Sequence, residues 1–438
     1  MRRCFLLALL LLPALLRAQE EKRALTVDAD FMTRGELRYG GLLPGEQQEG
    51  AEVSGERNRA AFILGRTRVG VGYKESAFSA KLTAQHSGTW GSDGSIGVYE
   101  AWARFDTKPG IFVQVGRQNL SYDDQRIFGS DDWSMTGMSH DALRFGYEGH
   151  GHKVHLMAAY NQNPENMDGG SYFAGGYQSY KAMEALWYHY DLTAWHLGAS
   201  AVFMNVGMQC IDAGRENEQT FQQQMAGAYL TFQPKGWLAE AAYYHQFGID
   251  ESGLPIDAWM ASGKVTATPS DAWQFYGGYD YLSGDPYFAT PANGMLGVTR
   301  HEVVRGFNSL FGSHNKFYGA MDFFYVTTYV YGFTPGLQNA FAGVRWAPVS
   351  TFAFNAAYHY LAIATTLPDV KKSLGHEFEF SGSWNFLRNA RLSVGYTFMQ
   401  GTETMEILKR TPQNHHLHWA WLMLSVTPKM QKKWYSND

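Results

Sequence analysis

The sequence is poor in cysteine, in long apolar runs and in net charge. Of its 438 residues two are cysteines, Cys4 and Cys210, and Cys4 lies ahead of an apolar run at the amino end. Removal of that end would leave one cysteine, which excludes an internal disulfide in the exported chain. No later stretch approaches the roughly 18 consecutive apolar residues of a membrane helix, so a helical membrane protein is excluded. A formal net charge of -5 argues against nucleic acid as a partner.

The amino end has the pattern of a secretory signal peptide. Two arginines precede an apolar run over residues 5–16, and polar residues follow Ala18. We expect cleavage after Ala18. This divides the chain into a signal peptide, 1–18, and one mature domain, 19–438.

Aromatic residues and glycines are abundant, with 28 Phe, 26 Tyr and 47 Gly, and these types favour strands and tight turns. In "VDADFMTRGELRY", residues 27–39, apolar and charged side chains alternate, and "GHEFEFSGSWNF" alternates in the same way. Strands of soluble sandwiches typically run about 5 or 6 residues. The alternating segments here run roughly 9 to 16 residues, the span of a tilted strand that crosses a bilayer. The pattern predicts a transmembrane β-barrel.

Short and long connections between these segments alternate along the chain. Eight short ones, "YKESAF", "DTKPGIF", "EGHGHKV", "YDLTAW", "QPKGWL", "TPSDAW", "APVSTF" and "FLRNARL", read as periplasmic turns, and longer polar segments read as extracellular loops. Two strands around each turn and one at each end predict an all-β fold, an antiparallel barrel of about 18 strands. Residues 316–333 would add a strand that antiparallel closure forbids, so we place them in a long extracellular loop, about 284–336. A soluble propeller or sandwich is the alternative, although no repeated blade motif occurs.

Two stretches are similar to a known family. "GRQNLSYDDQRIFGSDDWSMTGMSHDALRFGYE", residues 116–148, and "SLFGSHNKFYGAMDFFY", residues 309–325, resemble the alginate export family of outer-membrane porins. The resemblance implies an 18-stranded barrel with an arginine-rich, electropositive lumen through which an anionic polysaccharide reaches the cell surface.

The first of these stretches holds a loop, about residues 121–140, that is rich in carboxylates. Its aspartates do not follow the D-x-[DN]-x-[DN]-G rhythm of a calcium loop. We interpret it as a structural loop clamped by Asp–Arg pairs and a buried tryptophan. A direct part in substrate passage is the main alternative, ahead of metal binding or catalysis. The structural-loop candidates are Asp123, Asp124, Arg126, Asp131, Asp132 and Trp133.

Charged side chains of the strands are expected to face the lumen, because an arginine turned to lipid at the bilayer midplane costs about 2–4 kcal/mol. They either pair with one another and hold the wall or leave a surplus of arginine that binds passing anions. Candidate acidic partners for the inward cations are Asp28, Asp30, Glu36 and Glu240, in addition to the glutamates among the pore-lining candidates. The pore-lining candidates are Arg34, Arg38, Arg66, Arg68, Lys81, Glu100, Arg104, Arg117, Arg144, Lys264, Arg345, Glu377, Glu379 and Arg391.

The sequence therefore predicts a passive channel in the outer membrane of a Gram-negative bacterium, in contact with lipid, that moves an anionic saccharide or small anion. A general or substrate-specific uptake porin is the alternative, and a periplasmic export partner is left open. An enzyme is not expected, since no nucleophile elbow, H-E-x-x-H or Walker loop occurs. His416 and His418 share a strand face but make a weak metal signal. No cofactor is expected.

Overall fold

The computed structural model describes residues 22–40, 59–107, 109–162, 180–210, 219–285, 302–324, 334–367, 370–409 and 416–435. The expected signal peptide lies outside these residues. Among them, no helix combines the length and apolarity needed to cross a membrane, a search that does not concern strands.

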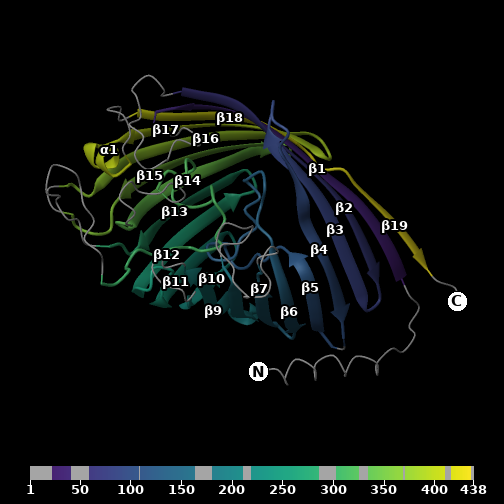
Figure 1. Cartoon of the computed structure of the whole chain (residues 1–438). Helices are drawn as coiled ribbons and strands as arrows, with labels where there is room; N and C mark the ends of the chain where they lie inside the picture. Colours follow the sequence, from purple (N-terminus) through teal and green to yellow (C-terminus); the bar gives the residue numbers. More distant parts are fainter. Residues whose placement is uncertain are drawn as a thin grey trace.

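The described residues form a closed antiparallel β-barrel (Figure 1). Long alternating segments become strands because every second side chain can then face lipid while its neighbours face the lumen. The strands are β1 (Lys22–Tyr39), β2 (Arg59–Glu75), β3 (Phe78–Thr89), β4 (Ser95–Asp106), β5 (Ile111–Gln118), β6 (His140–Gly149), β7 (His152–Tyr160), β8 (Ala182–Leu192), β9 (Leu197–Cys210), β10 (Gln219–Phe232), β11 (Trp237–Ile249), β12 (Pro255–Ser270), β13 (Trp273–Leu282), β14 (Leu337–Val349), β15 (Phe352–Ala362), β16 (Ser373–Leu387), β17 (Ala390–Gly401), β18 (His416–Val426) and β19 (Lys429–Tyr435). Two short helices accompany them, η1 (Thr193–Trp195) and α1 (Glu403–Lys409).

The barrel closes between its first and last strands. One edge of β1 pairs with β2, while the other pairs with β18 over Phe31–Tyr39 and with β19 over Lys22–Asp28. Pro428, which has no backbone N–H, lies between β18 and β19. These are two segments of one closing strand, so the barrel has 18 strands and the count from sequence is confirmed. Residues 316–324 contain no strand, as expected, and residues 325–333 lie outside the described part.

Each of the eight short turns predicted from the sequence joins two consecutive strands, as expected. The turn between β4 and β5 requires a glycine. Gly110 has a φ of +81°, and a Cβ atom there would lie 2.1 Å from the carbonyl oxygen of Glu148. The short turns are periplasmic, and the long connections lie at the extracellular end with α1 (Figure 1).

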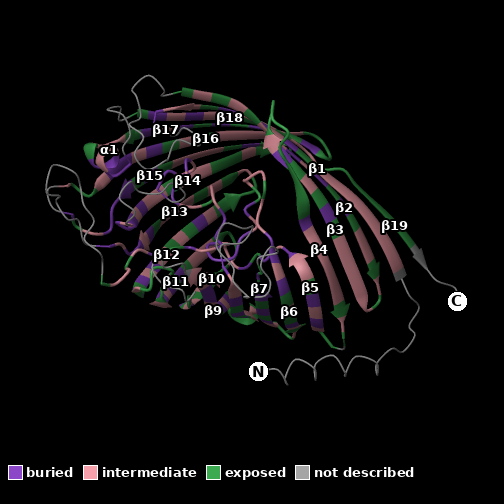
Figure 2. Cartoon of the chain, in the orientation of Figure 1, coloured by how far each residue is buried: buried purple, intermediate pink, exposed green. Residues whose placement is uncertain are grey.

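Burial alternates along the strands (Figure 2). On β18, Leu422 is 54% exposed on the outer face, whereas Leu417 is fully buried on the inner face. The largest buried apolar cluster lies inside the barrel, where Phe128 and Phe311 from two long loops belong to it. The core of this protein is therefore built in the lumen by loops that fold inward.

Candidate functional site

The first inward loop, residues 119–139, connects β5 to β6. The side-chain amide of Asn119 donates to the carbonyl of Met138 at 2.8 Å and closes the neck of the loop. Three of its residues, Asp123, Gln125 and Asp131, adopt positive φ angles of 50°, 72° and 47°. Short polar side chains tolerate this left-handed conformation better than branched ones do. The local sequence thus permits a tightly folded loop.

Arginines of the inner wall hold one side of this loop. Arg34 on β1 donates to the carbonyl oxygen of Trp133 at 2.8 Å, and Arg66 on β2 donates to that of Asp132 at 2.9 Å. Arg68 binds the Asp132 carboxylate at 2.8 Å. Arg66 is itself paired with Asp30 at 2.6 Å. These guanidinium groups act as anchors for the loop.

Trp133 covers the Arg34 anchor. The guanidinium carbon of Arg34 lies 4.0 Å from the centre of the Trp133 ring. The ring centres of Trp419 and Trp421 lie 5.9 and 5.1 Å from the same point. Trp133 is half-buried, not fully buried as the sequence interpretation had it, because it packs at the margin of the loop.

Replacing Trp133 with alanine is expected to lower folded yield and stability more than it changes ion selectivity. The change removes the aromatic contacts and the cation–π interaction, and we expect a loss of about 1–3 kcal/mol for this half-buried position. The shift from compact to unfolded mobility on gels with rising temperature measures it. Unchanged thermal stability together with altered selectivity would identify Trp133 as a pore element.

On the opposite side of the loop, the Asp123 carboxylate is bound without arginine. The Asp123 carboxylate accepts hydrogen bonds from the Trp187 indole at 3.0 Å and the Ser200 hydroxyl at 2.5 Å. Burial raises the pKa of Asp123, against the lowering effect of these two donors. The expectation that Asp–Arg pairs clamp the loop therefore does not apply to Asp123. It fails because the wall next to this carboxylate offers neutral donors.

Arg126 is the central connection of the site. It is 5% exposed and binds Asp124 of its own loop at 2.7 Å and Asp280 of β13 at 2.9 Å. It also donates to the Tyr318 hydroxyl at 3.0 Å and lies 4.2 Å from the centre of the Phe317 ring. Burial lowers the pKa of Arg126, but Tyr318 and the two carboxylates together hold it well above its usual value. One guanidinium thus joins both loops to the wall.

The second inward loop, of which residues 302–324 are described, packs on the first. Phe128 and Phe311 form a parallel bridge with stacked rings at 5.8 Å. The Ser313 hydroxyl accepts from the backbone N–H of Asp131 at 3.0 Å, and the Asp131 carboxylate accepts from the backbone N–H of His314 at 3.0 Å. Asp131 is thus bound to the other loop and has no arginine partner among the described residues. The two loops form one unit.

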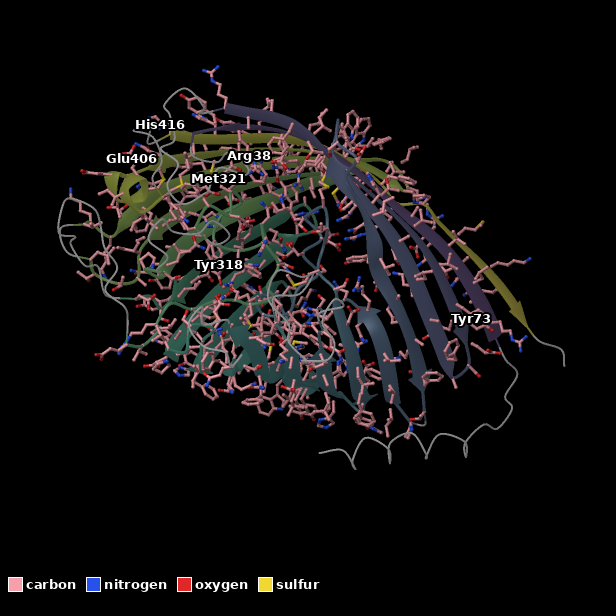
Figure 3. All side chains as sticks on the ribbon, viewed as in Figure 1. Arg38, Tyr73, Tyr318, Met321, Glu406 and His416 are labelled. Atoms are coloured by element: carbon pink, nitrogen blue, oxygen red, sulfur yellow. The ribbon has the colours of Figure 1, made fainter. Side chains whose placement is uncertain are left out.

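Two carboxylates of β16 hold the second loop against the wall. The backbone N–H of Ala320 donates to Glu379 at 2.7 Å, and that of Met321 donates to Glu377 at 3.1 Å. Gly319 has a φ of +94°, and a Cβ atom there would lie 2.8 Å from the Glu377 carboxylate. Glu377, expected to line the pore, is 1% exposed beneath this loop. Tyr318 and Met321 lie within the barrel outline (Figure 3).

Asp322 makes this loop sensitive to pH. Its Oδ1 atom is buried without a hydrogen-bond partner among the described residues. Burial raises the pKa of Asp322 well above its usual value, and Asp131 and Glu379 add to the rise while Asn315 and Arg38 oppose it. When the pKa of an acid is higher in the folded protein than in the unfolded chain, its protonated form stabilises the fold. This contribution is at its full value below the unfolded-state pKa of about 3.9, and it is lost as the pH rises through the folded-state pKa.

Loop 302–324 should accordingly lose hydrogen-exchange protection as pH rises. The Asp322→Asn variant should remove most of this dependence, since its amide does not ionise. Correction for the intrinsic exchange rate at each pH isolates the effect. A wild-type loop whose protection stays constant with pH would contradict this assignment.

Many of the other charged candidates meet a partner of opposite sign. Glu36 lies between Arg34 and Arg38, at 2.8 Å from each. Arg391 donates to Asn385 at a periplasmic turn. The other close pairs are Lys81 with Glu100 at 2.6 Å, Arg104 with Asp106 at 2.8 Å, Arg117 with Asp141 at 2.6 Å and Lys264 with Glu240 at 3.4 Å. The expectation that Arg117 lines the pore is wrong, because Arg117 and Asp141 alternate with the buried Gln118 and His140 and share the lipid-facing side of the wall with Val115 and Leu143.

Arg391 is an exception to this pattern because Asn385 is neutral, and three further cations differ from it as well. In the part of the chain that the structure describes, Arg144, Arg345 and Lys316 form no ion pair with a carboxylate. Arg144 donates to the neutral Tyr122 hydroxyl at 3.3 Å and to the Gln114 amide oxygen at 2.7 Å. Lys316 was not among the sequence candidates because it lies in a loop, where strand alternation says nothing about direction.

The histidines of β18 lie on the outer face of the barrel. His418 is hydrogen-bonded to the Tyr396 hydroxyl at 2.8 Å, and the His416 ring stacks on Phe398. Within the described ranges, no group of three or more His, Cys, Asp or Glu residues is placed to hold a metal ion.

Comparison with known proteins agrees with this architecture. A family model described as alginate export matches residues 95–407. No curated protein sequence matches the chain. Among solved structures, Pseudomonas aeruginosa OccK9 (OpdG) superposes with a TM-score of 0.60 at 11% identity, covering 93% of this chain and 98% of that one. P. aeruginosa OpdK with vanillate gives 0.59 at 10% identity, covering 93% and 99%. At these identities the likeness concerns the fold alone.

Proposed function

The chain belongs to the alginate export family and forms an outer-membrane channel, and from this premise we propose that it passively moves an anionic polysaccharide or a small anion. As a barrel in the outer membrane of a Gram-negative bacterium, it contacts lipid and passes solutes. Its family and fold indicate a channel, not an enzyme.

The proposal rests on three cations that form no ion pair with a carboxylate of the described chain, Arg144, Arg345 and Lys316. Each belongs to an inner-wall face or an inward loop. Arg345 shares its strand face with Asn339 and Phe341, two residues that line a cavity in the lumen. Cations without carboxylate partners attract passing anions, whereas paired ones contribute little net field. Guanidinium groups also match carboxylates in geometry.

A substrate-specific uptake porin for small solutes is the second candidate. It is supported by the two inward loops, whose buried side chains occupy part of the lumen. One of the structurally similar channels, OpdK, was crystallised with vanillate, a small molecule. Export would in turn require a periplasmic partner to deliver the polymer.

Block of the channel by a uronate oligomer tests the proposal. In planar bilayers, oligomer added to one side should interrupt the current of the wild-type channel. Arg144→Gln should weaken the block, and high salt should do the same because the Debye length shortens to about 3 Å near 1 M. Arg388→Gln, which removes a positive charge from the exposed turn between β16 and β17, is the control and should behave as wild type. Indifference of the wild-type channel to uronates would favour the uptake alternative.

A further inference from the structure

The lumen contains a cavity of about 520 Å³. It lies between the inner wall of β10–β16 and the two inward loops, of which the second contributes Lys316 and Phe317. Its volume falls within the range of about 300–1,000 Å³ that is usual for small-molecule sites. The cavity is therefore large enough to hold a ring-shaped solute.

Two aromatic rings lie against its wall, each over a glycine of the neighbouring strand. A Cβ atom at Gly343 would lie 2.3 Å from Tyr276, and one at Gly278 would lie 2.6 Å from Phe341. Tyr276 pairs in register with Gly343, and Phe341 pairs with Gly278, across β13 and β14. Both rings are half-buried and line the cavity. The glycines let the rings lie close to the backbone, which leaves an aromatic surface toward the cavity.

Polar groups that donate and accept hydrogen bonds border this surface in pairs. Lys264 lies 3.4 Å from Glu240, and Glu240 accepts from the Tyr229 hydroxyl at 2.5 Å. On the other side, His359 lies 3.2 Å from Glu379. Strand register places these residues in one row across β11–β15. In order, the row contains Glu240, Lys264, Gly278, Phe341 and His359. Donors and acceptors thus flank the aromatic surface at one level of the barrel.

The charge of the cavity argues against recognition of an anion there. Five carboxylates line it, against three lysine and arginine side chains. A ligand carboxylate would meet this acidic excess. Hydroxyl groups, in contrast, can donate to carboxylates and accept from ammonium groups at once.

We propose that this cavity is a subsite for an uncharged sugar ring. The apolar C–H face of the ring packs on Tyr276 and Phe341, and its hydroxyl groups bond to the paired polar groups of Glu240 with Lys264 and of His359 with Glu379. The inference rests on the proposed passage of solute through the lumen but not on anion preference. It adds a recognition of hydroxyl groups that arginines alone do not supply.

Binding of cellobiose, a neutral disaccharide, tests the subsite. Added to the wild-type channel in planar bilayers, it should produce current interruptions that hardly depend on salt. Tyr276→Leu and Phe341→Leu should each weaken this block about three- to tenfold, as expected for the loss of one aromatic contact. Gly343→Ala keeps every aromatic but displaces the Tyr276 ring, and it should weaken the block as well. Phe275→Leu, the neighbour of Tyr276 on the lipid face, is the matched control.

Each variant is first checked for the gel mobility of the folded barrel and for wild-type conductance. Cellobiose block that is lost in the inner-face variants and kept in Phe275→Leu supports the subsite. It does so even if the channel shows no anion preference, in which case only the proposed function fails. Absence of cellobiose block in the wild type overturns the subsite, and equal block in all variants does the same, whatever uronates do.

Discussion

Replacing Arg126 with alanine should raise the single-channel conductance and loosen both inward loops. The change leaves Asp124 and Asp280 buried without their common partner and removes the bond to Tyr318. Loss of one partner from a buried ion pair costs about 3–5 kcal/mol. That is enough to undock loop segments held by a few hydrogen bonds. Arg126→Lys should be intermediate, because lysine keeps the charge but lacks the planar group that reaches two carboxylates.

Conductance in planar bilayers and hydrogen-exchange protection of residues 119–139 and 302–324 measure this effect. Arg391→Ala, which removes an arginine at a turn, is the control and should change neither quantity. If Arg126→Ala keeps wild-type conductance and protection in both loops, the two loops do not depend on this residue and the single-unit description is wrong.

Neutralising Arg144, Arg345 and Lys316, which lack an ion pair, should at acidic pH shift ion selectivity more than neutralising three paired cations of the lumen. The triple variant Arg144→Gln, Arg345→Gln, Lys316→Gln removes three positive charges from the lumen while leaving the ion pairs intact. The matched triple variant Lys81→Gln, Arg104→Gln, Lys264→Gln removes inward cations whose carboxylate partners lie at 2.6, 2.8 and 3.4 Å.

The first triple variant should move the reversal potential in a salt gradient toward that of a cation-selective channel. The matched triple also loses three positive charges but exposes three carboxylates, which can take up protons or counter-ions. It should therefore shift the potential less at acidic pH, where those carboxylates are neutralised. Equal shifts of the two variants at acidic pH would show that pairing does not decide which cations act on passing ions.

The barrel could be predicted from sequence because its signals are local. A period of two residues fixes which side chains face lipid, and each short turn fixes which strands pair. Some ion pairs are local as well. Arg34 with Glu36 and Arg104 with Asp106 stand two residues apart on one strand face, where alternation alone brings them together.

The interior could not be predicted in this way, because its contacts join distant parts of the chain. Arg126 meets Asp280, and Asp131 meets His314, through loops that return into the lumen. Nothing in the local pattern says whether a loop folds outward or inward. Arg117 and Arg144 were both expected to face the lumen, but Arg117 lies on the lipid-facing side of the wall and is paired with Asp141, whereas Arg144 faces inward and binds neutral groups.

The reversal potential of the wild-type channel in a potassium chloride gradient tests the central proposal most directly. Purified barrel is inserted in a planar bilayer with a tenfold salt difference, and the voltage of zero current is read at neutral pH. The unpaired cations of the lumen predict a reversal potential shifted from zero toward the equilibrium potential of chloride, which indicates a preference for anions. A potential on the potassium side would contradict an anion channel.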